Sequence, residues 1–75
     1  MPERWIIHGE ELYRLNNAMS QLPYPQREVV ILHLQGDMKF KTIAKSQNVS
    51  INTVQSRYRY GLDKLRSLLN SEVEK

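Results

Sequence analysis

Apolar residues recur along the chain at intervals of three and four positions, which is the period of amphipathic helices. No segment combines an apolar run with the flanking residues of a strand, because the most apolar stretch, Val29–Leu34, lies inside a helical pattern. We therefore predict an all-α fold, a four-helix domain. The predicted helices run from Glu10 to Leu22, from Pro25 to about Gln35, from Lys39 to Gln47, and from Ser50 to about Asn70.

Residues that end helices separate the predicted ones. Pro25 suits the first turn of the second helix, where its missing N–H costs nothing, and Gly36-Asp37 stops that helix. Asn48 tolerates the left-handed conformation that a tight turn between helices needs. Ser50 is a favourable N-cap for the fourth helix. The third and fourth helices are therefore expected to be joined by a turn of only three residues, 48–50.

The same periodicity assigns a core and the domain boundaries. Residues 9–70 are predicted to form one domain, residues 1–8 a linker or flexible segment with Trp5 and Ile7 available for docking, and residues 71–75 a flexible polar tail. The expected core consists of the apolar stripes of the four helices: Leu12, Leu15, Ala18, Met19 and Leu22; Val29, Val30, Ile31, Leu32 and Leu34; Phe40, Ile43 and Ala44; and Val54, Tyr58, Leu62, Leu65 and Leu69.

The third and fourth helices with their short turn have the layout of a helix-turn-helix, whose second helix enters the major groove of DNA. Helices joined so closely must touch, and Ala44 supplies a small residue at the contact. Val49 fills the angle after the turn, and Val54 packs back on the third helix. The pattern favours a DNA-binding domain.

Charge agrees with this assignment. The 75-residue chain has a formal net charge of +3 and a pI near 9.5, a balance that permits nucleic-acid binding. The positive charge concentrates in residues 39–66, which contain Asp63 as their single acid. The seven basic residues of this window are Lys39, Lys41, Lys45, Arg57, Arg59, Lys64 and Arg66.

Outward-facing residues of the fourth helix suit the reading of bases. With Val54 and Tyr58 inside, the outward set holds Asn and Gln, which pair with adenine, Arg, which pairs with guanine, and Ser and Thr, which pair with either. Arg57, which lies beside the apolar stripe, could instead pin the fourth helix to the second through Glu28. The candidate DNA-binding residues are Lys39, Lys41, Thr42, Ser50, Asn52, Thr53, Gln55, Ser56, Arg57, Arg59 and Tyr60.

The sequence does not favour a disulfide, a metal site, a catalytic site or a membrane span. The chain has no cysteine, and His8 and His33 are far apart in sequence without further ligands, so neither a disulfide nor a metal site is expected. No nucleophile or acid–base constellation is present, so we expect no enzyme, no cofactor and no small-molecule substrate. No apolar run approaches the roughly 20 residues of a membrane span. A cytoplasmic protein without membrane contact is expected.

Several motifs resemble region 4 of extracytoplasmic-function-type bacterial sigma factors. They are Leu22-Pro23, Arg27-Glu28-Val29-Val30, Ile43-Ala44, Val49-Ser50, Thr53-Val54-Gln55-Ser56-Arg57, Leu65-Arg66 and Leu68-Leu69. The resemblance covers Gln21–Leu69 and implies a four-helix domain that reads the promoter −35 element through its fourth helix. It also implies docking on the flap of the RNA polymerase β subunit through an apolar groove of the earlier helices, with an anti-sigma factor as a further partner.

Departures from that family pattern leave alternatives open. The family usually has Glu where this chain has Thr42, often Gly where it has Asn48, and an aliphatic, Ala-containing stretch where it has residues 58–61. One alternative is the DNA-binding effector domain of a response regulator, although Gln55-Ser56-Arg57 fits that family poorly. Another is a module that binds polymerase or an anti-sigma factor without reading DNA. Nothing resembles sigma region 2, so the chain is expected to be either an excised domain or a stand-alone regulator.

Overall fold

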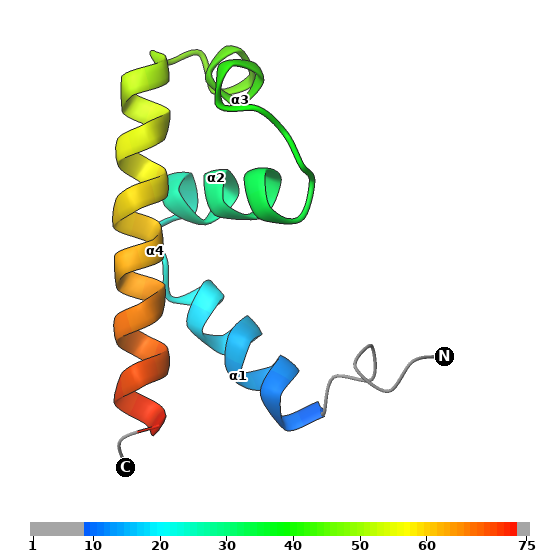
Figure 1. The fold of residues 1–75 in the computed structure, drawn as a ribbon, viewed down its shortest axis with the longest axis vertical. Helices are drawn as coiled ribbons and strands as arrows, with labels where there is room; N and C mark the ends of the chain where they lie inside the picture. The colour runs from blue at the N-terminus through cyan, green and yellow to red at the C-terminus, as the bar shows by residue number, and fades with distance from the viewer. Residues whose placement is uncertain (1–8, 74–75) are drawn as a thin grey trace.

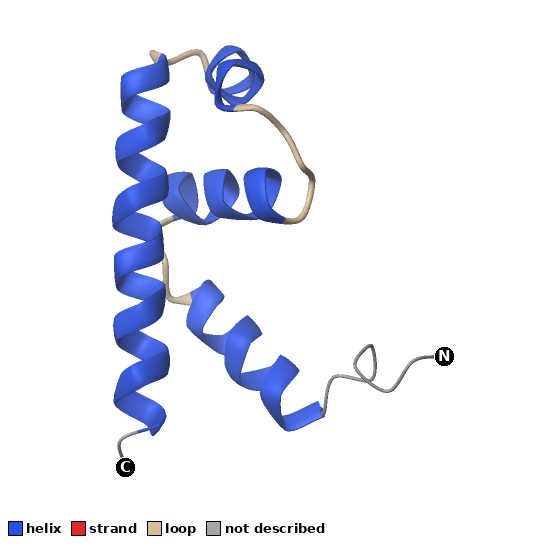
Figure 2. Cartoon of the chain, in the orientation of Figure 1, coloured by secondary structure: helices blue, strands red, loops and turns tan. Residues whose placement is uncertain are grey.

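The computed structural model describes residues 9–73, with side chains for residues 9–70, and contains four helices and no strand within that range. The helices are α1 (Gly9–Ser20), α2 (Tyr24–Leu34), α3 (Phe40–Gln47) and α4 (Ile51–Val73), as Figure 2 shows. The predicted all-α class and the number and order of the helices are confirmed. Helix α4 ends three residues later than expected, and the predicted linker 1–8, with Trp5 and Ile7, lies outside the described residues.

Helix α4 is the element against which the other three pack. It runs along one side of the molecule, with α3 beside its first turns, α2 crossing it near its middle and α1 beside its C-terminal half (Figure 1). Its apolar stripe at steps of three and four is long enough to serve all three partners. No helix within residues 9–73 combines the length and the apolar character needed to cross a membrane.

Two adjacent valines of α2 divide the core into two clusters. Val29 is fully buried with Ile43, Ala44 and Val54, and this cluster joins α2 and α3 to the first turns of α4. Val30 is fully buried in the other cluster, which joins α1 and α2 to the C-terminal half of α4 through Ala18, Met19, Leu22 and Leu65. Tyr58 packs against both clusters and makes the core continuous.

Gly61 permits α2 and α4 to approach closely where they cross. It is buried, and a Cβ built on it would lie 2.8 Å from Cγ2 of Val30 and 3.5 Å from Cβ of Gln26. These distances leave no room for a side chain unless the helices separate. A glycine in a helix interior costs about 1 kcal/mol relative to alanine, so close packing is the compensating gain at this position.

Two residues of the expected core are exposed. Leu34 is 57% exposed and Leu12 is 44% exposed. Leu34 lies in the last turn of α2, which projects away from α4, and Leu12 lies near the N-terminal end of α1, which also diverges from α4 (Figure 1). The prediction that every position of the stripes is core was therefore wrong at these ends, because helical periodicity does not reveal where a partner helix stops.

The loop after α2 turns at the second of the two residues expected to end that helix, Gly36 and Asp37. Asp37, with φ of 53°, takes the left-handed conformation, and no glycine has a positive φ among the described residues. Glycine is needed at position 36 for lack of space rather than for a positive φ, because a Cβ there would lie 2.8 Å from the carbonyl oxygen of Leu32. The amide of Met38 then donates to that same carbonyl at 3.0 Å and closes the end of the helix.

The crossing at Gly61 yields a test of the packing. In an open helix, Gly61→Ala would stabilise the protein by about 1 kcal/mol through helix propensity. Here we expect a net loss of about 1 kcal/mol, because the new methyl group collides with Val30, whose branched side chain is stiff. The free energy of unfolding in urea would measure this change.

A Val30→Ala background serves as the control. Removing the colliding methyl groups should turn Gly61→Ala from a destabilising into a stabilising change relative to its own background. An identical effect of Gly61→Ala in both backgrounds would show that the two side chains do not compete for the same space.

Candidate nucleic-acid interface

The turn between α3 and α4 has the geometry that a helix-turn-helix needs. Asn48 adopts the left-handed conformation, with φ of 58° and ψ of 46°, and the amide of Val49 donates to the carbonyl of Ala44 at 3.0 Å. Ser50 caps α4, since its Oγ accepts the backbone N–H of Thr53 at 3.1 Å. The predicted roles of Asn48 and Ser50 are confirmed, and together they fix the direction in which α4 leaves the turn.

Polar residues on the first turns of α4 are exposed around this turn. Asn52, Gln55, Arg59 and Tyr60 are exposed, whereas Thr53, Ser56 and Arg57 are half-buried. The Arg59 guanidinium lies over the Tyr60 ring, 5.4 Å from its centroid. The predicted outward face of α4 is therefore available to a ligand, most fully at positions 52, 55 and 59.

The basic residues of α3 border the same turn. Lys39 immediately precedes α3, and Lys41 and Lys45 lie on it with Thr42; all four are exposed. No acid occurs between Asp37 and Asp63, and Asp63 has Arg66 at 3.6 Å. The N-terminal end of the α4 helix dipole adds a partial positive charge. This end of the domain is therefore suited to a polyanion.

Arg57 is held inside the domain by a chain of hydrogen bonds that connects three helices. Its Nη1 donates to Oε1 of Gln47 at 2.8 Å, and Nε2 of Gln47 donates to Oε1 of Glu28 at 2.7 Å. Of the two roles considered for Arg57, the link to Glu28 is present, but it is indirect because Gln47 lies between them. Arg57 thus ties α4 to α3 and, through Gln47, to α2.

Tyr24 continues this network onto the surface of α2. Its hydroxyl donates to Oε2 of Glu28 at 2.9 Å, and the Arg27 guanidinium lies 5.7 Å from the centre of its ring. The hydrogen bond to Glu28, followed by the negative charge of that carboxylate, raises the pKa of Tyr24 above its ordinary value. The Tyr24 hydroxyl therefore keeps the proton that it donates to Glu28 throughout the neutral pH range.

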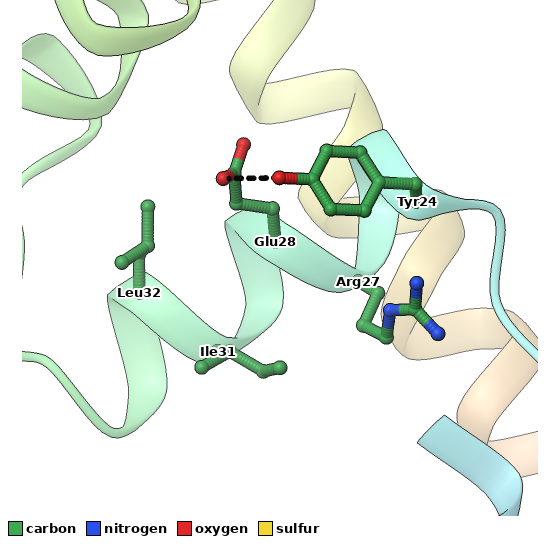
Figure 3. Close-up of a pocket in the computed structure, with 5 residues that line it drawn as sticks. All are labelled: Tyr24, Arg27, Glu28, Ile31 and Leu32. Carbon is green, nitrogen blue, oxygen red and sulfur yellow. Dashed lines mark hydrogen bonds between the residues drawn. The ribbon is translucent and has the colours of Figure 1, made fainter. Parts of the chain in front are cut away.

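A shallow groove lies beside this network on α2. It has a volume of about 270 Å³ and is lined by the apolar side chains of Ile31 and Leu32 and by Tyr24, Arg27 and Glu28 (Figure 3). Figure 3 shows the Tyr24–Glu28 hydrogen bond toward one end of the groove and the aliphatic side chains of Ile31 and Leu32 toward the other end. None of these five residues is among the candidate DNA-binding residues predicted from the sequence.

Comparison with known proteins agrees with this geometry. The family model described as Sigma-70, region 4 matches residues 12–65, a range that begins in α1 and ends in α4. The chain belongs to the sigma-70 region 4 family. The ECF RNA polymerase sigma factor RpoE of Cereibacter sphaeroides is 33% identical over 57 residues, which cover 76% of this chain and 32% of that protein. No solved structure was found to match the chain.

The predicted resemblance to region 4 of extracytoplasmic-function-type sigma factors is thereby confirmed. Sigma-70 region 4 is a family of DNA-binding domains and not of enzymes. The region 4 domain described here spans about a third of the length of the curated relative. Within residues 9–73, no group of three or more His, Cys, Asp or Glu side chains could hold a metal ion.

The His33 side chain packs against two aromatic rings in this region 4 domain. Its ring stacks on Phe40 at 4.3 Å and meets Tyr58 edge-on at 4.9 Å. Nδ1 of His33 lies 2.9 Å from the carbonyl oxygen of Met38, so the tautomer with a proton on Nδ1 donates there. His33 thus closes the gap between α2, the following loop and α4.

The sequence pattern gave no indication that Gln47 and Tyr24 belong to this hydrogen-bond network. Both are single polar residues without a repeating pattern, and their partners are brought together only by the crossing of α2, α3 and α4. Glu28 and Arg57 carried a weak signal, a lone acid and a lone base beside apolar stripes. The signal indicated that the two residues could be connected, and it gave no information on what lies between them.

Removing the central amide tests the network. Gln47→Ala deprives Arg57 of an acceptor and Glu28 of a donor. We therefore expect the free energy of unfolding to fall by about 1–2 kcal/mol. The loss is smaller than for fully buried groups because these side chains are only half-buried. Gln55→Ala is the matched control, since Gln55 is exposed and should change stability little. Equal effects of the two substitutions would contradict a stabilising role for Gln47.

Proposed function

We propose that this domain binds promoter DNA in transcription initiation and reads the −35 element through α4 in the major groove. Support comes from the exposed polar face on the first turns of α4, placed next to basic residues by the Asn48 turn. In a helix-turn-helix, the N-terminal residues of the second helix contact base edges. Membership of the sigma-70 region 4 family favours promoter DNA over other duplexes, and it favours this function over that of a response-regulator effector domain.

The candidate contacts divide into readers and anchors. Asn52, Gln55 and Arg59 are exposed on α4 and have side chains that pair with base edges. Lys39 and Lys41 are exposed beside the turn and are suited to phosphates, which position a protein without specifying sequence. Thr42, Ser50 and Tyr60 are exposed among these groups and remain candidates for phosphate or base contacts, as do the half-buried Thr53 and Ser56.

Arg57 has a different role from the readers and anchors in this proposal. Its hydrogen bond to Gln47 uses one of the five N–H donors of a guanidinium, so a phosphate contact through another donor stays available. We assign it first to holding α4 in place, because that contact is internal and half-buried. Its contribution to DNA binding then depends on keeping Gln55 and Arg59 in position.

Readers and anchors are separable by experiment. Gln55→Ala should lower the preference for a −35 duplex over a scrambled duplex by about 1–3 kcal/mol, since a bidentate base contact is lost. Lys41→Ala should weaken binding to both duplexes equally and reduce the slope of log affinity against log salt by about 1. Fluorescence anisotropy at several salt concentrations measures both quantities.

Two outcomes of these titrations would overturn the proposal. If Gln55→Ala weakens both duplexes equally while Lys41→Ala changes their ratio, the assignment of reader and anchor is wrong. If the wild-type chain binds neither duplex even at low salt, the domain is a protein-interaction module and does not read DNA.

We further propose that the groove on α2 is the docking site for the β flap of RNA polymerase. Ile31 and Leu32 give it an apolar lining, and it shares no residue with the proposed DNA contacts, so both partners could bind at once. Arg27 and Glu28 at its rim supply polar groups that would orient a bound segment.

A flap fragment provides the test of docking. Ile31→Ala should weaken binding of a purified β flap fragment about tenfold, the effect typical of an apolar contact at the centre of an interface. Leu34→Ala is the matched control, because Leu34 is an exposed aliphatic residue of α2 outside the groove. Equal losses for the two variants, or none for either, would exclude this groove as the docking site.

A further inference from the structure

An aliphatic side chain stands exposed at the start of the recognition helix. Ile51 is the first residue of α4 and is 42% exposed. It belongs to neither core cluster, and it is the only large aliphatic residue of α4 that is exposed among the described side chains. Leu12 and Leu34 are exposed because they lie where α1 and α2 diverge from α4. Ile51, by contrast, directly follows the turn at which α3 and α4 pack together.

The residues around Ile51 are polar and exposed. Ser50 precedes it as the N-cap, Asn52 follows it, and Gln55 lies four positions later and so on the same side of the helix. A β-branched residue has no advantage in helix propensity at this position. Helix formation therefore does not account for isoleucine here, and a large part of its side chain stays available to a ligand.

We infer that Ile51 reads the 5-methyl group of a thymine in the major groove. This inference rests on the proposed function and adds a specificity residue to it. The N-terminal residues of a recognition helix lie against base edges, and the thymine methyl is the apolar group that those edges present. Against any other edge, Ile51 would cover a donor or an acceptor without replacing its hydrogen bond to water.

Helix geometry limits where that thymine lies. Ile51 and Gln55 are separated by four residues, or about 6 Å along the helix axis. Base pairs are spaced at about 3.4 Å, so the thymine falls within about two base pairs of the base that Gln55 contacts. Gln pairs with adenine, so the proposed target is a thymine next to, or one removed from, an A·T pair read by Gln55.

Exchange of thymine for uracil removes the methyl group and leaves every hydrogen-bonding group in place. The experiment first selects a duplex from a randomised pool with the 75-residue chain, and then replaces each thymine of the selected duplex by uracil, one at a time. At one position we expect the wild-type chain to lose roughly fourfold in affinity, the effect of burying one methyl-sized group. The same position should be insensitive to the exchange in Ile51→Ala.

Two further variants are controls. Ile51→Val keeps a branched aliphatic side chain and should retain part of the dependence on the methyl group. Leu34→Ala removes another exposed aliphatic side chain, from α2, and should respond to the exchange as the wild-type chain does. Thermal unfolding confirms that each variant is folded, and an exposed position such as 51 should leave the melting temperature nearly unchanged.

The possible results separate this inference from the proposed function. If uracil exchange lowers the affinity of the wild-type chain and of Ile51→Ala by the same factor at every position, Ile51 does not read a methyl group. The inference also fails if the selected duplex has no thymine within two base pairs of the position at which Gln55→Ala loses discrimination. If the chain enriches no sequence from the pool, sequence-specific DNA reading itself is refuted.

Discussion

The close contact between Val30 and Gly61 is the constraint on which the rest of the domain depends. It sets the distance at which α2 crosses α4, and the neighbouring Val29 then reaches the second cluster with Ile43 and Val54. A side chain at Gly61 would separate the helices and affect both clusters, because α2 contributes to each of them. In a 75-residue chain without disulfides, few other contacts are available to compensate.

The crossing of α2 and α4 orients the proposed readers through intermediate contacts. These contacts are polar. Gln47 connects Arg57 of α4 to Glu28 of α2, at the level where α3 packs on both. The apolar clusters fix the separation of the helices, whereas hydrogen bonds with defined directions restrict their rotation. The first turns of α4 therefore have a defined orientation, which side chains that read base edges require.

Different sides of the domain have different chemistry. Basic residues and exposed amides gather around the turn at Asn48, while the groove on α2 is lined by Ile31 and Leu32. The Tyr24–Glu28–Gln47–Arg57 chain runs between them, with Tyr24 and Glu28 at the groove and Arg57 on α4. An occupant of the groove would thus touch residues that are hydrogen-bonded, through Gln47, to the helix that carries the readers.

The sequence by itself determined the helices, the turn and the outward face of α4. These depend on local properties: the three-to-four period of apolar residues, the tolerance of Asn48 for positive φ, and the capping hydroxyl of Ser50. It did not determine the exposure of Leu12 and Leu34, the glycine-mediated crossing at Gly61, or the place of Gln47 between Arg57 and Glu28. Each of these is decided by where one helix ends relative to another and by the distance between them, and such relations between distant residues have no periodic signature in a single chain.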